Sequence, residues 1–117
     1  MASLYRVLPQ AAWDAACRSG VVPRCGNDHR ADGVNLNLAE AVPYTVHRYF
    51  VREERPVVLE VDSAGLAEHI EWRAPLPEEP WARPLARIPE LPVSAVISVR
   101  AVSEAELAGA SLGGGVS

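Results

Sequence analysis

The sequence contains no lysine, because all eleven of its basic residues are arginines. A lysine Schiff base is therefore excluded, and an anion site must use arginine forks, helix N-termini or backbone amides. Fifteen acidic residues outweigh the arginines and give a formal net charge of −4. A chain of this balance lacks the broad positive field of a general DNA-binding protein, so we expect no DNA partner.

Long hydrophobic runs are also missing. No segment approaches the roughly 20 apolar residues that a membrane helix needs, and the opening MASLYRVL is too short for a signal peptide. We therefore expect a cytoplasmic protein without membrane contact. The length of 117 residues suits one globular domain, expected over residues 1–109, and the glycine-rich residues 110–117 are expected to form a flexible tail.

Cysteine is scarce, with only Cys17 and Cys25 present. In the absence of a secretory signal we expect both to be free thiols. Cys25 and His29 stand one helical turn apart, but no second pair of metal-ligating residues follows at a zinc-binding spacing. We therefore expect no metal.

Hydrophobic periodicity predicts strands that alternate with two main helices. Strands are expected over residues 3–8, 34–38, 56–61, 69–73 and 94–102, and helices over residues 9–19 and 43–53. Gly20 ends the first helix, and Pro43 either kinks the second or marks its start near Val42. This order favours an α+β fold over a doubly wound sheet. No glycine-rich phosphate motif follows a strand, which excludes a Rossmann or P-loop site.

Two segments show no regular period. Residues 20–33 predict a long loop, which is the best candidate for a mobile lid over a site. The proline-rich residues 75–84 cannot hold a regular helix or a central strand, so an irregular crossing is expected there. After the last strand, Ser103 and Glu106 form a capping-box pattern that predicts one short helical turn.

Polar residues on the first two strands are the best candidates for ligand binding. Arg6 lies in the middle of the first strand, where it either binds an anion or pairs with an acid on a neighbouring strand. Asn35 and Asn37 lie on one side of the second strand. They either face a cleft or form a solvated edge, with Asn37 capping the next helix.

Two further candidates follow later in the chain. Arg48 and Arg52 are one helical turn apart and either form an anion site or belong to a solvated face of mixed charge, of which Arg52 is the secondary candidate. Trp81, inside the proline-rich segment, either anchors that segment or stacks on an aromatic ring in a cleft.

The ordered set LYRVL, DGVNLNLAEAV, HRYFVREERPVVLEVD and LPVSAVISVRAV resembles the bacterial family called domain of unknown function 952. This resemblance implies an ADP-ribosyltransferase-like fold, in which two small β-sheets face one another across a cleft that holds NAD in relatives. Residues 34–37 and 55–62 are also similar to the VHLS and KPVVLxVD segments of RNA 2′-phosphotransferases.

The resemblance also suggests roles for particular residues. The LYR arginine, Arg6, is similar to the arginine with which toxin-like ADP-ribosyltransferases orient NAD, whereas Asn35 and Asn37 stand where those enzymes carry serines. Family members usually carry histidines at the positions of Arg6 and Asn35. The late catalytic glutamate has only loosely placed counterparts, namely Glu78, Glu79 and Glu90, so no catalytic residue is assigned.

Three functions follow as hypotheses. The first is a domain that binds NAD or a related phosphorylated nucleoside, with weak or altered transferase activity. The second is a non-catalytic ligand-binding module on the same scaffold. The third is a small protein-interaction domain, such as one half of a toxin and antitoxin pair. The ligand is expected to be a nucleotide-like small molecule, and the protein a monomer or small homo-oligomer.

Overall fold

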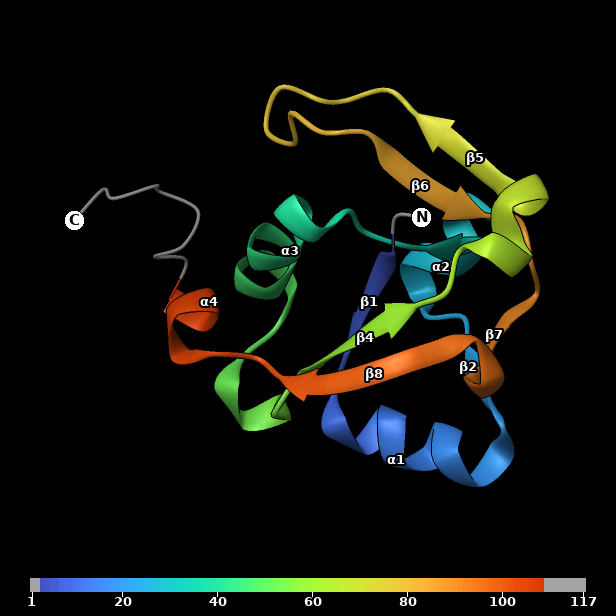
Figure 1. Ribbon diagram of the computed structural model, residues 1–117. Helices are drawn as coiled ribbons and strands as arrows, with labels where there is room; N and C mark the ends of the chain where they lie inside the picture. Colours follow the sequence, from blue (N-terminus) through green and yellow to red (C-terminus); the bar gives the residue numbers. More distant parts are fainter. Residues whose placement is uncertain (1–2, 109–117) are drawn as a thin grey trace.

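The computed structural model describes residues 3–108, which form eight strands and four α-helices (Figure 1). In chain order these elements are β1 (Leu4–Leu8), α1 (Gln10–Ser19), β2 (Val21–Pro23), α2 (Gly26–Ala31), β3 (Val34–Asn35), α3 (Val42–Tyr49), β4 (Val57–Val61), β5 (Ile70–Arg73), β6 (Arg83–Ala86), β7 (Glu90–Pro92), β8 (Val96–Ala101) and α4 (Glu104–Ala108). The predicted tail, residues 110–117, lies outside the described residues. None of the described helices has the length and apolar character that a membrane crossing requires.

The strands form two three-stranded antiparallel sheets and one two-stranded ribbon. The strand order is β1-β4-β8 in the first sheet and β3-β6-β5 in the second, and β2 pairs with β7. The two larger sheets lie on opposite sides of the molecule, with α1 below the first sheet (Figure 1). The predicted α+β class is therefore confirmed, and α1 and α3 are the two longest helices.

Strand alternation in β1 separates two hydrophobic clusters. Leu4 and Leu8 face the larger cluster, together with Leu59 of β4 and Ala16 of α1. Val7 points to the opposite face and joins a smaller cluster beneath α3. Arg6 shares its face with Leu4 and Leu8, so this strand carries a guanidinium directly into the interior, where the arginine is only 7% exposed.

The first helix matches its prediction closely. Pro9 immediately precedes α1, and Gly20 follows it with a left-handed φ of 90°. The N–H of Gly20 donates to the carbonyl oxygen of Ala16 at 2.7 Å, which satisfies one of the last helical carbonyls. Because a left-handed residue at this position favours glycine, the sequence marks the end of α1 correctly.

The prediction of a long loop over residues 20–33 is wrong. The segment contains β2 and α2, and it is held by long-range contacts that local periodicity does not reveal. Val22 of β2 lies opposite Leu91 of β7, and both side chains are buried. At the end of the segment a Cβ on Gly33 would lie 2.7 Å from the carbonyl oxygen of Ala86, so only glycine permits this close approach. The segment is therefore part of the folded framework, not an irregular lid.

The second predicted strand is shorter than expected and connects the two sheets. β3 pairs with β6 through Val34 and Asn35 only. The chain then moves to the first sheet, where Asn37 and Tyr5 exchange two backbone hydrogen bonds of 2.7 and 2.8 Å. Residues 34–38 thus form one wall of the space between the sheets.

The second helix begins as one of the two sequence interpretations predicted. α3 starts at Val42, with Pro43 in its first turn, where the missing N–H costs no helical hydrogen bond. It ends at Tyr49, earlier than the predicted residue 53, because the chain becomes extended at Phe50 and then forms a separate 3₁₀ turn at Arg52–Glu54.

The proline-rich residues 75–84 are predicted to contain no central strand, and this prediction is wrong for residues 83 and 84. Pro84 lies in β6, the central strand of the second sheet, and its side chain is buried. The carbonyl of Pro84 accepts a hydrogen bond from Leu36 at 3.1 Å, on the side of β3. In an antiparallel strand the backbone N–H and C=O of one residue point to the same side. The N–H that Pro84 lacks would therefore also point toward β3, beyond its last residue, Asn35.

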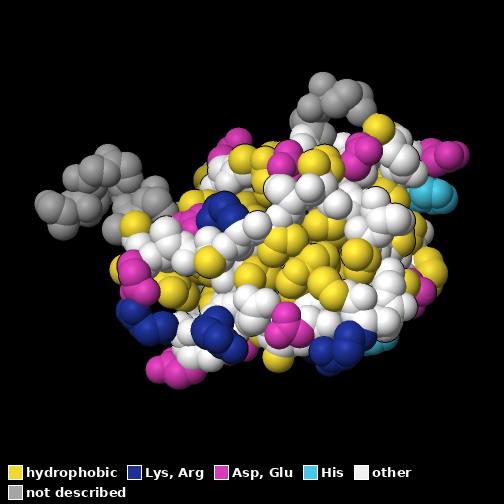
Figure 2. Space-filling view, turned by 60° about the horizontal axis from the view of Figure 1, so that its bottom comes forward, with side chains coloured by type: hydrophobic (Ala, Val, Ile, Leu, Met, Phe, Trp, Pro, Cys, Tyr) yellow, Lys and Arg dark blue, Asp and Glu magenta, His cyan; other side chains and the backbone are white. Residues whose placement is uncertain are grey.

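One face of the molecule is markedly apolar. Figure 2, in which the bottom of Figure 1 comes forward, shows hydrophobic side chains gathered at the centre of the face that carries α1 and β8. β8 is an edge strand, and its Ile97 and Val99 are 58% and 40% exposed. The state of assembly predicted from the sequence, a monomer or small homo-oligomer, stays a prediction.

Candidate functional site

A cleft of about 710 Å³ lies between the two sheets. Its walls come from the end of β1, from α2 and β3, from one side of α3, and from the chain between β5 and β6. The charged residues that line it are Arg6, Arg24, Arg30, Arg73, Arg83, Asp28 and Glu79. The cleft is therefore basic, although the whole chain is acidic.

Arg6 and Asp28 form an ion pair at the buried side of the cleft, which we call the buried pair. Arg6 Nη1 lies 3.1 Å from Asp28 Oδ1, and Nη2 lies 2.5 Å from Oδ2. The Asp28 side chain is fully buried and that of Arg6 is 9% exposed. The predicted interpretation of Arg6 as a free phosphate fork is not supported by this geometry, because Asp28 occupies both terminal nitrogens. The alternative, a pair with an acid, describes the contact, although the acid lies on α2 and not on a strand.

The surroundings of Asp28 keep its carboxylate charged. Burial raises the pKa of this carboxyl, but the hydrogen bonds and charge of Arg6 lower it, and together with two backbone donors they outweigh burial. The backbone N–H groups of Asn35 and Cys25, each 2.9 Å from an Asp28 oxygen, lower the pKa further. The net pKa lies below the ordinary value for aspartate. Asp28 is thus an anchor for three segments of the chain and is not poised as a proton donor.

Asn35 connects the buried pair to the opposite wall of the cleft. Its side-chain Nδ2 donates to Asp28 Oδ1 at 2.9 Å, and its Oδ1 accepts from Arg73 Nη2 at 2.8 Å. Its backbone carbonyl accepts from Arg6 Nη1 at 2.9 Å. The structure therefore places Asn35 in the cleft, which is one of the two positions that the sequence left open. Both the nitrogen and the oxygen of its side-chain amide already form hydrogen bonds within the protein.

Asn37 also lines the cleft but does not cap a helix. Its Oδ1 accepts a hydrogen bond from Thr45 Oγ1 of α3 at 2.8 Å, and its backbone pairs with Tyr5. The expected capping of the next helix by Asn37 is therefore wrong: the residue before the 3₁₀ turn at Ala39–Ala41 is Leu38, and α3 follows Ala41. Asn37 instead joins α3 to the first sheet.

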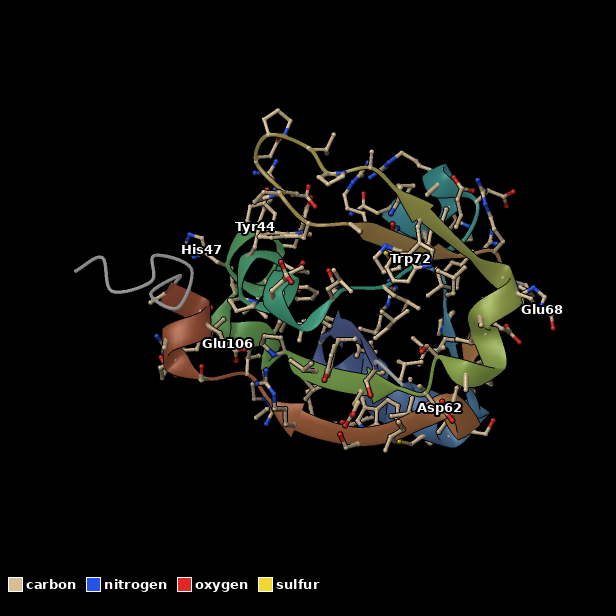
Figure 3. The ribbon with its side chains drawn as sticks, turned by 45° about the horizontal axis from the view of Figure 1, so that its top comes forward. Tyr44, His47, Asp62, Glu68, Trp72 and Glu106 are labelled. Carbon is tan, nitrogen blue, oxygen red and sulfur yellow. The ribbon has the colours of Figure 1, made fainter. Side chains whose placement is uncertain are left out.

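Trp81 lies in the cleft, as the stacking interpretation requires. Its ring packs edge-on against Tyr44 of α3, with ring centroids 5.5 Å apart and an interplanar angle of 67°. Figure 3 shows Tyr44, in the first turn of α3, next to the connection between β5 and β6. This aromatic contact fixes the tryptophan at the border between the two elements.

Arg52 does not belong to the cleft. It forms an ion pair with Glu104 of α4, and both side chains are largely exposed. The secondary prediction that Arg52 binds a ligand with Arg48 is therefore not supported, because the end of α3 at Tyr49 separates the two arginines into different elements. Of the three candidate acids only Glu79 lines the cleft, whereas Glu78 and Glu90 do not.

Five charged cleft residues were missed by sequence reasoning, namely Arg24, Asp28, Arg30, Arg73 and Arg83. Asp28 had no sequence signal, because Cys25 and Asp28 do not match the Ser/Thr-x-x-Glu/Gln pattern of a capping box. Arg73 lies in the predicted strand 69–73, but nothing local indicates which sheet face it occupies. Arg83 had no signal, because β6 itself was not predicted.

The two thiols agree with the expectation of free cysteines. Cys17 and Cys25 are both exposed and unpaired. Within residues 3–108 no group of three or more histidine, cysteine, aspartate or glutamate side chains is arranged to hold a metal ion.

Comparison with known proteins supports the fold. No family model matches the chain, and no curated protein matches it. The chain is similar to the crystal structure of protein CC0527 from Caulobacter crescentus, with 25% identity, a TM-score of 0.74 and coverage of 86% of both chains. It is also similar to the solution NMR structure of CC0527, with 29% identity, a TM-score of 0.66, and coverage of 86% of this chain and 84% of that one. These names state no activity, so the resemblance to domain of unknown function 952 stays a prediction.

Proposed function

We propose that the cleft binds a phosphorylated nucleoside such as NAD or ADP-ribose. The observation that carries this proposal is the charge of the lining: five arginines and two carboxylates face one cavity in a protein of net charge −4. One carboxylate, Asp28, is already paired with Arg6. An anionic ligand would therefore find uncompensated positive charge in this cleft, although the chain as a whole is acidic.

The size and the remaining lining suit a ligand with an aromatic ring. A volume of about 710 Å³ falls within the roughly 300–1,000 Å³ of small-molecule sites. Trp81, Tyr49 and Phe50 contribute aromatic surface to the same cleft. A nucleobase or nicotinamide ring gains stacking energy on such surfaces, while the phosphates meet the arginines.

The arrangement of the sheets is compatible with the ADP-ribosyltransferase-like fold that the sequence resemblance implies. Residues from both larger sheets line the cleft, and the predicted NAD site of that fold lies between two facing sheets. This agreement supports the choice of NAD among phosphorylated nucleosides.

Transferase activity would require a carboxylate near the ribose. Cleavage of the bond between nicotinamide and ribose develops positive charge on the sugar, and an acid stabilises it. Glu79 is the candidate for this role, since Asp28 is held by Arg6. The same ion pair favours the second candidate function, a non-catalytic binding module, because it removes the free arginine fork that the sequence resemblance places on the first strand.

Calorimetric titration of NAD and ADP-ribose into the protein tests the proposal. We expect both ligands to bind, more weakly when the salt concentration rises from about 50 to 200 mM, because charged contacts are screened. Adenosine and nicotinamide, which lack phosphate, serve as matched ligand controls and should bind much more weakly. Absence of heat with both phosphorylated ligands would overturn the proposal and favour the protein-interaction hypothesis, which a pull-down then examines.

A nicotinamide-release assay separates the two candidate functions once binding is established. Turnover that falls about 100-fold in Glu79→Gln, with NAD affinity retained, would support a transferase or hydrolase that uses Glu79. Binding of NAD without release of nicotinamide would support the binding module.

A further inference from the structure

Two arginines lie opposite one another on neighbouring strands of the second sheet. Arg73 of β5 and Arg83 of β6 are register partners in an antiparallel pair, so their side chains lie on the same face. Both are partly buried and both line the cleft. Like charges directly opposite one another destabilise a sheet, so this placement lowers the folding stability. Such a loss of stability is typical of residues that serve a binding function. We call these two residues the arginine pair.

Among the described residues, neither member of the arginine pair forms an ion pair with a carboxylate. Glu79 nevertheless lines the same cleft. Burial and then the facing charge of Arg83 lower the pKa of the Arg73 guanidinium, although the charges of Glu71 and Glu79 oppose this shift. Arg73 remains charged at neutral pH, and a bound anion would stabilise that partly buried charge.

The hydrogen bonds of the arginine pair hold the two side chains but leave donors free. Arg83 Nε donates to the carbonyl oxygen of Ala74 at 3.0 Å, and Arg73 Nε lies 3.4 Å from the carbonyl oxygen of Arg83. Arg73 Nη2 donates to Asn35 Oδ1. Nη1 of Arg73 and both terminal nitrogens of Arg83 have no hydrogen-bond partner within the described residues. These nitrogens are the type of donor that binds phosphate oxygens in pairs.

The buried pair fixes the position of Arg73 through Asn35. Asp28 holds the amide nitrogen of Asn35, and the amide oxygen then receives Arg73. Because Arg6 keeps Asp28 charged and in place, the buried pair orients Arg73, while the terminal nitrogens of Arg6 are used by Asp28 and Asn35.

We propose that Arg73 and Arg83 together bind the phosphate groups of the ligand, with Asn35 and Asp28 as positioning residues. This inference deepens the proposed function and rests on it only for the nucleoside part of the ligand. The arginine pair alone predicts affinity for a diphosphate. Trp81 precedes Arg83 by two residues, so the ring of a nucleotide would lie at the Trp81 side of the bound phosphates.

Titration with inorganic pyrophosphate and with ADP-ribose tests the inference. We compare the wild type with Arg73→Gln, Arg83→Gln and Arg18→Gln, a control that removes the same charge from an exposed arginine of α1 outside the cleft. Each cleft variant is expected to bind pyrophosphate about 10- to 100-fold more weakly, and the control to stay within about twofold of the wild type. Equal pyrophosphate affinity in wild type and both cleft variants would overturn the inference.

The two ligands separate this inference from the proposed function. Loss of pyrophosphate binding in the cleft variants, with ADP-ribose no tighter than pyrophosphate, supports the phosphate site and overturns the nucleoside part. ADP-ribose binding that neither cleft variant weakens supports the proposed function and overturns the phosphate site. If neither ligand binds the wild type, both are overturned.

Thermal unfolding distinguishes a binding role from a structural one. If the arginine pair serves a ligand, removing one of two facing charges leaves the unfolding temperature of the ligand-free protein equal to or above that of the wild type. A fall of several degrees in both cleft variants would instead mark them as structural and overturn the inference.

The positioning role of Asn35 requires its own measurement. In Asn35→Ala we expect weaker pyrophosphate binding, together with a shifted or broadened NMR signal of the Arg73 side chain and an unchanged signal of Arg83. Altered signals of both arginines to the same extent would contradict a specific role of Asn35 in orienting Arg73.

Discussion

The cleft contains two arrangements of arginine that differ in burial and in the presence of a paired carboxylate. In the buried pair, Asp28 neutralises Arg6 and satisfies both of its terminal nitrogens. In the arginine pair, Arg73 and Arg83 lie opposite one another, and neither forms an ion pair with an acidic side chain within residues 3–108. The difference indicates a division of roles, because a buried charge must be paired for the fold to persist, whereas a partly exposed and uncompensated charge is available to a ligand. Burial and pairing, rather than residue type, therefore distinguish the structural arginine from the binding arginines.

The largest effect is expected from breaking the buried pair. Asp28→Asn leaves the Arg6 guanidinium buried without a counter-charge, and such a loss typically costs about 3–5 kcal/mol of folding free energy. Urea denaturation at pH 7 measures this cost. A decrease below about 1 kcal/mol would show that Arg6 finds another partner and that the buried pair is not the anchor of the cleft.

A second ion pair, between Arg100 and Glu106, provides a more exposed comparison. Arg100 donates to both Glu106 oxygens at 2.9 and 2.8 Å, and its side chain is 52% exposed; Figure 3 labels Glu106 on α4. The Arg100 hydrogen bonds, with those of Ser103, lower the pKa of Glu106 from 4.5 to about 2. After allowance for screening, Glu106→Gln should cost roughly 1–2 kcal/mol at pH 7.

The pH dependence of that cost has a definite sign. A carboxyl with a lowered pKa stabilises the protein above its unfolded pKa, and this contribution is lost as the pH falls through the folded value. The difference in unfolding free energy between wild type and Glu106→Gln should therefore have its largest value above about pH 5 and decrease as the pH falls toward 2. Denaturation curves across this range check it, and a constant difference would contradict the ion-pair explanation.

Replacing the whole buried pair should cost less than breaking it, because no unpaired charge remains in the double variant Arg6→Met with Asp28→Leu. Some stability is still lost, because the backbone N–H groups of Cys25 and Asn35 and the Asn35 amide lose the acceptor that Asp28 provides. Pyrophosphate binding should weaken as well, because Asn35 is no longer held in the position that receives Arg73. A stable double variant with unchanged affinity would show that the buried pair does not orient the binding arginines.

The smallest effect is expected at Arg52. Its exposed ion pair with Glu104 predicts a stability change within about 0.5 kcal/mol for Arg52→Gln. Because Arg52 lies outside the cleft, its replacement should leave the affinity for ADP-ribose within error of the wild type. Weakened binding in the calorimeter would restore the sequence-based prediction of Arg52 as a ligand residue.

The regular elements of the fold follow from local sequence more readily than the site does. The strand that contains Arg6, the helix that ends at Gly20 and the capping box at Ser103 each depend on neighbouring residues, and the structure contains all three. β2 and β7 are short, and they are stabilised by pairing with one another across a long stretch of chain. No local pattern encodes such a pairing, and the same limit hid the central strand β6.

The site depends on three-dimensional neighbours for the same reason. The sequence left two interpretations open for each of Arg6, Asn35 and Trp81, and the structure places all three in the cleft. The sequence did not decide whether Arg6 is free to bind an anion or paired with an acid. The partner that binds Arg6, Asp28, stands in a segment whose short helix was expected to be a loop. The register that sets Arg73 opposite Arg83 exists only once β5 and β6 have paired. The charge balance of the cleft is therefore a property of the tertiary structure.

The most direct test of this account is an NMR titration that observes the side-chain Nε–Hε signals of the eleven arginines while ADP-ribose is added. Assignment by single Arg→Gln variants identifies Arg6, Arg73 and Arg83. We predict that the signals of Arg73 and Arg83 shift most on binding, and that the signal of Arg6, which is held by Asp28, shifts little. Large shifts of Arg6 with unchanged signals of Arg73 and Arg83 would contradict the division between a structural and a binding arginine site.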